Sequence, residues 1–108
     1  MLNTSAAAID LIKKQQGLSL EKYRDDNGIE IIGYGHVIQH GENFHGLITP
    51  EEAERLLYND IQIYEALLRG DTTRSITQHQ HDTLVLLMFS FADKPRAAKA
   101  IAQAVVRV

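Results

Sequence analysis

Apolar residues along this chain recur with a helical period in some stretches and with a strand period in others. Residues 6–16 carry two isoleucines three positions apart, which places both on one face of a helix. Thr4 or Ser5 can supply the side-chain oxygen that begins such a helix, and Gly17 is typical of the residue that ends one. The pattern therefore predicts an amphipathic helix near the start of the chain.

A short β element is expected next. Asn27-Gly28 is a dipeptide typical of a tight hairpin turn, and the β-branched run at 29–34 predicts a strand directly after it. We therefore expect a small hairpin or meander over residues 20–36. Residues 36–48 have no hydrophobic period and predict a loop.

A long helix is predicted over residues 50–69. Thr49 stands before Pro50 and has an acidic residue three positions on, which is the pattern of a capping box with proline at the first helical position. Apolar residues then follow a 3.6-residue period, with Asp60 as the polar interruption. Gly70 is the expected C-terminal stop.

Thr77 predicts the start of another helix. Its body, at 84–91, is apolar on every face, which is typical of a central buried helix. Pro95 opens a last, alanine-rich helix that runs to residue 106. Together these elements predict an α+β fold with a small N-terminal β element, about four helices and one buried central helix.

Composition and charge exclude several classes of protein. The chain has 108 residues, the size of one domain, and no cysteine, which excludes disulfides, thiolate zinc sites and cysteine nucleophiles. A net charge of −3 argues against a nucleic-acid surface. No apolar run reaches the ~20 residues of a membrane helix, and the start lacks the basic-then-apolar pattern of a signal peptide. We expect one domain over residues 1–108, without nucleic acid and without membrane insertion.

Residues 15–36 resemble the active-site signature of the phage-type lysozymes, glycoside hydrolase family 24. The matching positions stand at the family spacing and are Gly17, Leu18, Leu20, Tyr23, Asp25, Gly28, Ile32, Gly33, Gly35 and His36. A run this long at fixed spacing is a specific signal. The resemblance implies a lysozyme-like fold and peptidoglycan as the substrate class.

The chain departs from the family where the catalytic residues stand. The family uses a glutamate, an aspartate and a threonine, and those positions are Gln16, Asp25 and Ile31 here. A glutamine has no proton to deliver to the leaving oxygen, and loss of a general acid typically costs ~10²–10⁴-fold in rate. An isoleucine makes no hydrogen bond to a water. We therefore expect no intact catalytic site.

Other carboxylates are poor substitutes for the missing acid. Glu30 is adjacent to Ile31 on the expected strand and should point to the opposite face, and Glu21 is expected in solvent. Asp25 is either a surviving site carboxylate or a turn residue that accepts backbone N–H groups. Gln16 is either a sugar-binding remnant or a polar residue at a helix end.

The expected remnant of a substrate-binding site consists of Gln16, Asp25, Tyr34 and His36. His36 has a second interpretation, a structural hydrogen bond that holds the hairpin to a helix. Of the other histidines, those in the loop lack partnering cysteines or paired acids, and those at 79 and 81 are two apart, which does not place them together on a helix face. We therefore expect no metal ion and no cofactor.

The family has further helices after the central one, and they complete a second lobe across the sugar cleft. Residues 93–108 offer one alanine-rich helix, so the resemblance implies a truncated C-terminal lobe and a shallow cleft. The valines at the end of the chain then either cover the core or form an apolar patch for a partner.

The leading hypothesis is a non-catalytic lysozyme-like module, a structural or binding component of a phage or prophage particle, in its tail, spike or baseplate. Its partners would be other virion proteins or a second copy. It would reside in the virion, or in the bacterial cytoplasm before assembly. One alternative is an endolysin-like muramidase with altered catalytic residues. Another is a module that binds peptidoglycan without cleaving it.

Overall fold

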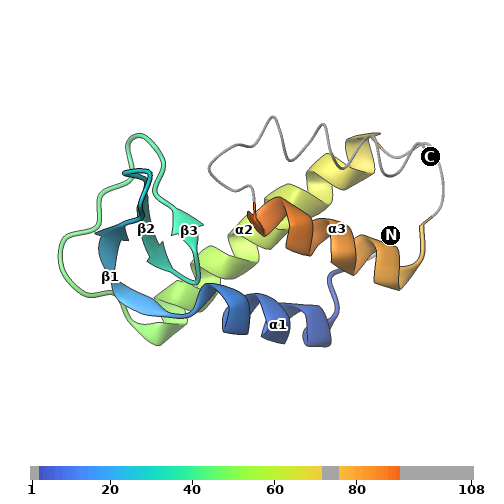
Figure 1. Cartoon of the computed structure of the whole chain (residues 1–108), viewed down its shortest axis with the longest axis horizontal. Coiled ribbons are helices and arrows are strands. Elements are labelled where there is room, and N and C mark those ends of the chain that lie inside the picture. Colours follow the sequence, from blue (N-terminus) through green and yellow to red (C-terminus); the bar gives the residue numbers. More distant parts are fainter. Residues whose placement is uncertain (1–2, 72–75, 91–108) are drawn as a thin grey trace.

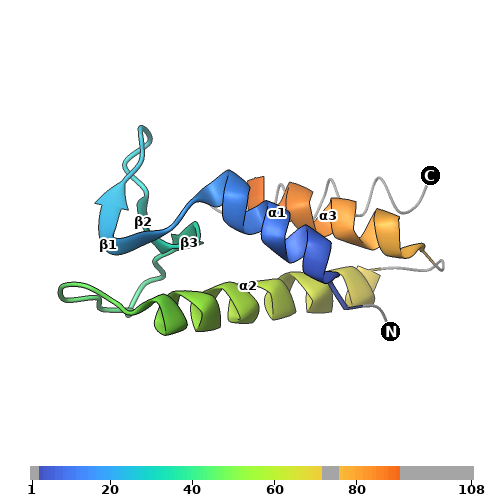
Figure 2. The same ribbon diagram turned by 90° about the horizontal axis from the view of Figure 1, so that it is seen from below.

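The computed structural model describes residues 3–71 and 76–90 (Figure 1). Within these ranges the elements, in chain order, are α1 (Ala6–Gln16), β1 (Ser19–Arg24), β2 (Glu30–Gly33), β3 (His36–Val37), α2 (Pro50–Asp71) and α3 (Gln78–Ser90). The sheet lies at one end of the molecule, and α2 runs from it along the other two helices (Figure 2). This is an α+β fold, as the sequence predicts. The helix predicted at 95–106 lies outside the described residues.

The helices begin where the sequence places their caps. Ser5 Oγ accepts the Ala8 N–H at 3.2 Å before α1. Thr49 and Thr77 each accept a backbone N–H at 3.1 Å, before α2 and α3 respectively. Gly17 follows α1 with a φ of +70°, a conformation that favours glycine. These bonds satisfy N–H groups that the first turn of a helix leaves without a partner, and the predicted starts are confirmed.

The end of α2 differs from the prediction. The helix continues to Asp71, so Gly70 lies inside its last turn instead of ending it. A glycine inside a helix costs about 1 kcal/mol relative to alanine, and a long helix that packs along its length tolerates that cost.

The sheet is a three-stranded antiparallel meander in the order β1-β2-β3, which confirms the element expected over residues 20–36. Its third strand lies at the start of the segment predicted as loop, where His36 pairs with Ile32 and Val37 pairs with Ile31. A strand of two residues is too short to show an alternating pattern, so the sequence did not reveal it.

Two hydrophobic clusters stabilise the fold. The larger lies among the helices and contains Ile12, Leu57, Ile61, Leu68, Leu84, Val85, Met88 and Phe89. The smaller, between the sheet and α2, contains Ile32, Ile48 and Ala53. Tyr34 packs against both clusters and so joins the sheet to the helices.

Helix α3 packs against both α1 and α2, as expected for a central helix, and contributes Leu84, Val85, Met88 and Phe89 to the larger cluster. Val85 and Met88 are completely buried on it. Its last residue, Ser90, is exposed, and α3 ends toward the sheet (Figure 1). None of the helices in the described ranges is both long and apolar enough to cross a membrane.

Candidate functional site

A pocket of about 180 Å³ lies where the end of α1, the sheet and the end of α3 meet. Its lining, within the described part of the chain, is Gln16, Asp25, Ile29, Ile31, Gly35, Val37, Phe89 and Ser90. Gln16, Asp25 and Ile31, which stand at the catalytic positions of the family that the sequence resembles, thus share one pocket. Sequence reasoning did not identify the contribution of α3, because no local signal relates residues 89 and 90 to a turn more than 60 positions earlier.

Gln16 and Ile31 approach the pocket from different elements. Gln16 is the last residue of α1, and its side chain lies against the backbone of Gly35. Ile31 lies on β2, where it pairs with Tyr23 on one side and Val37 on the other. The pocket therefore presents an amide at the position of the family's acid and an alkyl group at the position of its hydroxyl.

Asp25 is held by hydrogen bonds typical of a turn residue. Its Oδ1 accepts the Asn27 N–H at 2.8 Å and the Ile29 N–H at 2.9 Å. Its backbone carbonyl accepts the Gly28 N–H at 3.0 Å, which closes the turn between β1 and β2. The same carboxylate lines the pocket, so it has the turn role and remains available for a role in the site.

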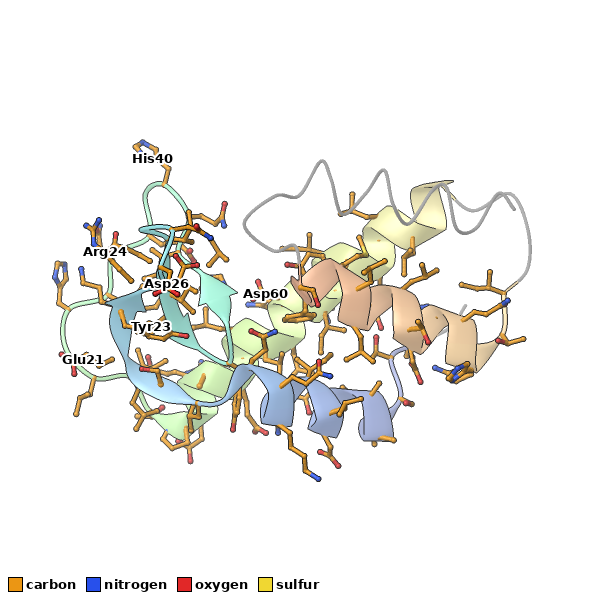
Figure 3. All side chains as sticks on the ribbon, viewed as in Figure 1. Glu21, Tyr23, Arg24, Asp26, His40 and Asp60 are labelled. Carbon is orange, nitrogen blue, oxygen red and sulfur yellow. The ribbon has the colours of Figure 1, made fainter. Side chains whose placement is uncertain are left out.

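Asp25 is the one carboxylate among the described residues that line the pocket. Glu30 lies instead 3.8 Å from the ammonium of Lys22, and Glu21 lies at the outer edge of the sheet (Figure 3). The described residues include no group of three or more metal-ligating side chains placed to hold a metal ion. Acid–base chemistry in this pocket therefore depends on Asp25 and on solvent.

His36 lies outside the described lining of the pocket and ties the sheet to α2. Its Nδ1 lies 2.8 Å from Asp60 Oδ2, and its Nε2 lies 2.9 Å from Glu42 Oε1. Burial alone would lower the pKa of His36, but the hydrogen bonds and charges of the two carboxylates outweigh burial and raise it to about 8. This arrangement matches the structural interpretation of His36, and it explains why the apolar face of α2 carries Asp60. Its assignment to substrate binding stays a prediction.

The second partner of His36 was not expected from the sequence. Glu42 lies in the segment without hydrophobic period, and its carboxylate also accepts the Gln39 N–H at 2.7 Å. Burial would raise the pKa of Glu42, but the hydrogen bonds from Gln39 and His36 lower it instead. Phe44 packs against the smaller hydrophobic cluster, between the sheet and α2. Its ring meets the His36 ring edge-on, with ring centres 6.3 Å apart.

Tyr34 is also absent from the described lining of the pocket. It packs between the two hydrophobic clusters, and the Lys13 ammonium lies 5.4 Å from the centre of its ring. These contacts give Tyr34 a structural role, and its assignment to substrate binding stays a prediction.

Fold and pocket together define a lysozyme-like domain. The phage lysozyme family matches residues 13–103, which is most of the chain, and the chain therefore belongs to that family. The resemblance drawn from the sequence motifs is confirmed.

Two endolysins illustrate the relationship. The endolysin of Acyrthosiphon pisum secondary endosymbiont phage 1 is 36% identical over 89 residues, which cover 82% of this chain and 60% of that protein. The endolysin of Salmonella phage P22 is 29% identical over 104 residues, covering 94% of this chain and 71% of that protein. This chain thus spans somewhat more than half the length of the first of these relatives.

Solved structures confirm the lysozyme-like fold. A chain described as a phage endolysin from S. enterica has 43% identity and a TM-score of 0.75, and the match covers 82% of this chain and 94% of that one. The muramidase domain of SpmX from Asticaccaulis excentricus has 26% identity and a TM-score of 0.77, and the match covers 99% of this chain and 71% of that one.

Proposed function

We propose that this chain is a peptidoglycan-directed domain of the endolysin type, with a muramidase-like pocket that holds a glycan strand. The observation that carries the proposal is the pocket itself, which gathers Gln16, Asp25 and Ile31 from three separate segments. Relatives named as endolysins and as a muramidase domain support the same assignment.

The leading hypothesis from the sequence, a structural component of a phage particle, receives less support. It rested on the altered catalytic positions and on the phage context of the family. The names of the relatives favour the peptidoglycan alternative. Residence in the virion or in the bacterial cytoplasm, a partner protein and a truncated C-terminal lobe all stay predictions.

The chemistry of the pocket sets what this domain can do with a glycan. Cleavage of a glycosidic bond requires a proton on the leaving oxygen and help for a water or nucleophile on the other face of the sugar. The Gln16 amide can donate a hydrogen bond to the glycosidic oxygen but cannot transfer a proton. The Asp25 carboxylate can stabilise positive charge that develops on the sugar. We therefore expect hydrolysis slower by ~10²–10⁴-fold than with a glutamate at position 16.

A second candidate function is binding of peptidoglycan without cleavage. The substitution of both an acid and a hydroxyl in one pocket favours it, because a bound sugar then meets an amide and an alkyl group. Both candidate functions require binding of peptidoglycan, and they differ only in whether the natural protein cleaves it.

Clearing of a suspension of purified peptidoglycan tests both candidates. We would compare the natural protein with Gln16→Glu and with Gln16→Glu/Ile31→Thr. The expected result is little or slow clearing by the natural protein and clearing at least ~10²-fold faster by the double variant. Glu21→Gln in the double-variant background is the matched control, because Glu21 is a carboxylate outside the pocket lining; it should leave the rate unchanged.

Co-sedimentation with insoluble peptidoglycan completes the test. Binding by the natural protein without any clearing would identify the non-cleaving module. Absence of both binding and clearing, in the natural protein and in the double variant, would contradict the proposed function. Rapid clearing by the natural protein would contradict the assigned role of Gln16 and would make the other carboxylates the next candidates for the acid.

A further inference from the structure

The turn between β2 and β3 brings the backbone of Gly35 against the side chain of Gln16, the last residue of α1. A Cβ built on Gly35 would stand 2.8 Å from Gln16 Cδ and 3.0 Å from Gln16 Cγ, and closer still to Oε1. Real Cβ atoms essentially never approach other atoms within 3.0 Å, so any side chain at position 35 would displace the Gln16 amide.

From this contact we propose that Gly35 is a positioning residue of the pocket. Its missing side chain leaves the space in which the Gln16 side chain lies. Gly35 itself lines the pocket only with its backbone. It acts through Gln16, and the inference holds whatever the pocket binds.

Backbone conformation alone does not explain the glycine. Gly33 and Gly35 are both buried, and their φ angles are +69° and +72°. An alanine at either position is therefore strained to a similar extent. A Cβ on Gly33 would meet Ala53 at 3.6 Å, which is ordinary van der Waals contact. An alanine would thus strain the backbone at both positions, but only at position 35 would its Cβ clash with a residue of the pocket.

Gly33→Ala is therefore the matched control for Gly35→Ala. Each substitution would be made in the natural background and in a Gln16→Ala background, and the Tm of all variants compared. We expect Gly35→Ala to lower the Tm only slightly more than Gly33→Ala in the natural background, because the displaced Gln16 atoms are the end of a flexible side chain. In the Gln16→Ala background, where the amide is gone, we expect the two losses to become equal.

A second readout follows the Gln16 side chain itself. In a 1H–15N spectrum, the side-chain NH₂ resonances of Gln16 should shift strongly in Gly35→Ala and little in Gly33→Ala. A role of Gly35 in stability alone would not produce this difference, because both substitutions strain the backbone alike.

Unmoved side-chain NH₂ resonances of Gln16 in Gly35→Ala would overturn the proposal, and so would an excess Tm loss for Gly35→Ala that persists after Gln16→Ala. If Gly35→Ala does not fold, Gln16→Ala/Gly35→Ala must fold as well as Gln16→Ala/Gly33→Ala. Failure of that double variant alone would also overturn the proposal.

Discussion

His36 on β3 and Asp60 on α2 are joined by a contact of 2.8 Å between Nδ1 and Oδ2, across 24 positions of sequence. Figure 3 shows Asp60 where α2 passes the sheet. With Glu42 at the other ring nitrogen, the imidazole faces a carboxylate on each side. Only the protonated ring can donate to both carboxylates, so the two carboxylates favour the charged form of the buried His36.

The first prediction concerns the pH dependence of folding. The pKa of His36 in the folded state is raised from 6.5 to about 8. The stabilisation is therefore fully present below pH 6.5 and is lost as the pH rises through about 8. A shift of this size corresponds to about 2 kcal/mol in the free energy of unfolding. Denaturant unfolding of the natural protein between pH 6 and pH 9 should show this loss.

Asp60→Asn is the informative variant for that prediction. It keeps an oxygen near His36 but removes the charge that raises the pKa of the ring. The decline in stability above pH 6.5 should therefore become shallower. An unchanged decline in Asp60→Asn, or in His36→Gln, would show that another group is responsible.

The second prediction separates the turn role of Asp25 from its role in the pocket. Asp25→Asn keeps an Oδ1 acceptor for the Asn27 and Ile29 N–H groups, so its Tm should remain near that of the natural protein. Asp25→Ala removes both hydrogen bonds and should cost roughly 1–3 kcal/mol.

The site role of Asp25 has a different signature. In the Gln16→Glu/Ile31→Thr background, Asp25→Asn should slow the clearing of peptidoglycan although the Tm hardly changes. Full clearing by that triple variant would leave Asp25 with the turn role alone.

The third prediction concerns Glu65, a buried carboxylate that accepts hydrogen bonds from Thr4 near the start of the chain. Glu65 Oε2 on α2 accepts the Thr4 N–H at 2.7 Å and the Thr4 hydroxyl at 2.8 Å, and it lies 3.7 Å from His81 Nε2. Glu65→Leu leaves these groups without their acceptor and should cost roughly 2–4 kcal/mol. Glu65→Gln keeps an acceptor and should cost less.

Chemical denaturation at constant pH measures both Glu65 variants. Gln62→Leu is the control, because Gln62 is exposed on the same helix and its replacement should change stability by less than about 0.5 kcal/mol. Equal losses for Glu65→Leu and Gln62→Leu would contradict this role of Glu65.

The fourth prediction tests the central position of α3. Met88 has no exposed surface, and Met88→Ala should cost about 2–5 kcal/mol because a cavity remains in the helical cluster. Leu47 is 73% exposed, so Leu47→Ala should cost less than about 0.5 kcal/mol. Thermal unfolding of the two variants compares them directly, and a small loss for Met88→Ala would place α3 at the edge of the core.

The sequence by itself determined the features that depend on near neighbours along the chain. Helix starts at Ser5, Thr49 and Thr77 follow from hydrogen bonds between residues three positions apart, and the turn at Asp25 follows from bonds that reach four positions. The family positions at 16, 25 and 31 could be read from spacing for the same reason, since they lie within one short segment.

Only the tertiary structure decided which distant residues meet. Packing of α3 brings Phe89 and Ser90 to the pocket, and packing of α2 brings Asp60 to His36. Neither pairing has a local signal, because it depends on how the hydrophobic faces of whole elements are buried against one another. The role of Gly35 is of the same kind. The sequence shows that position 35 is a glycine, and only the fold shows that a side chain there would clash with Gln16.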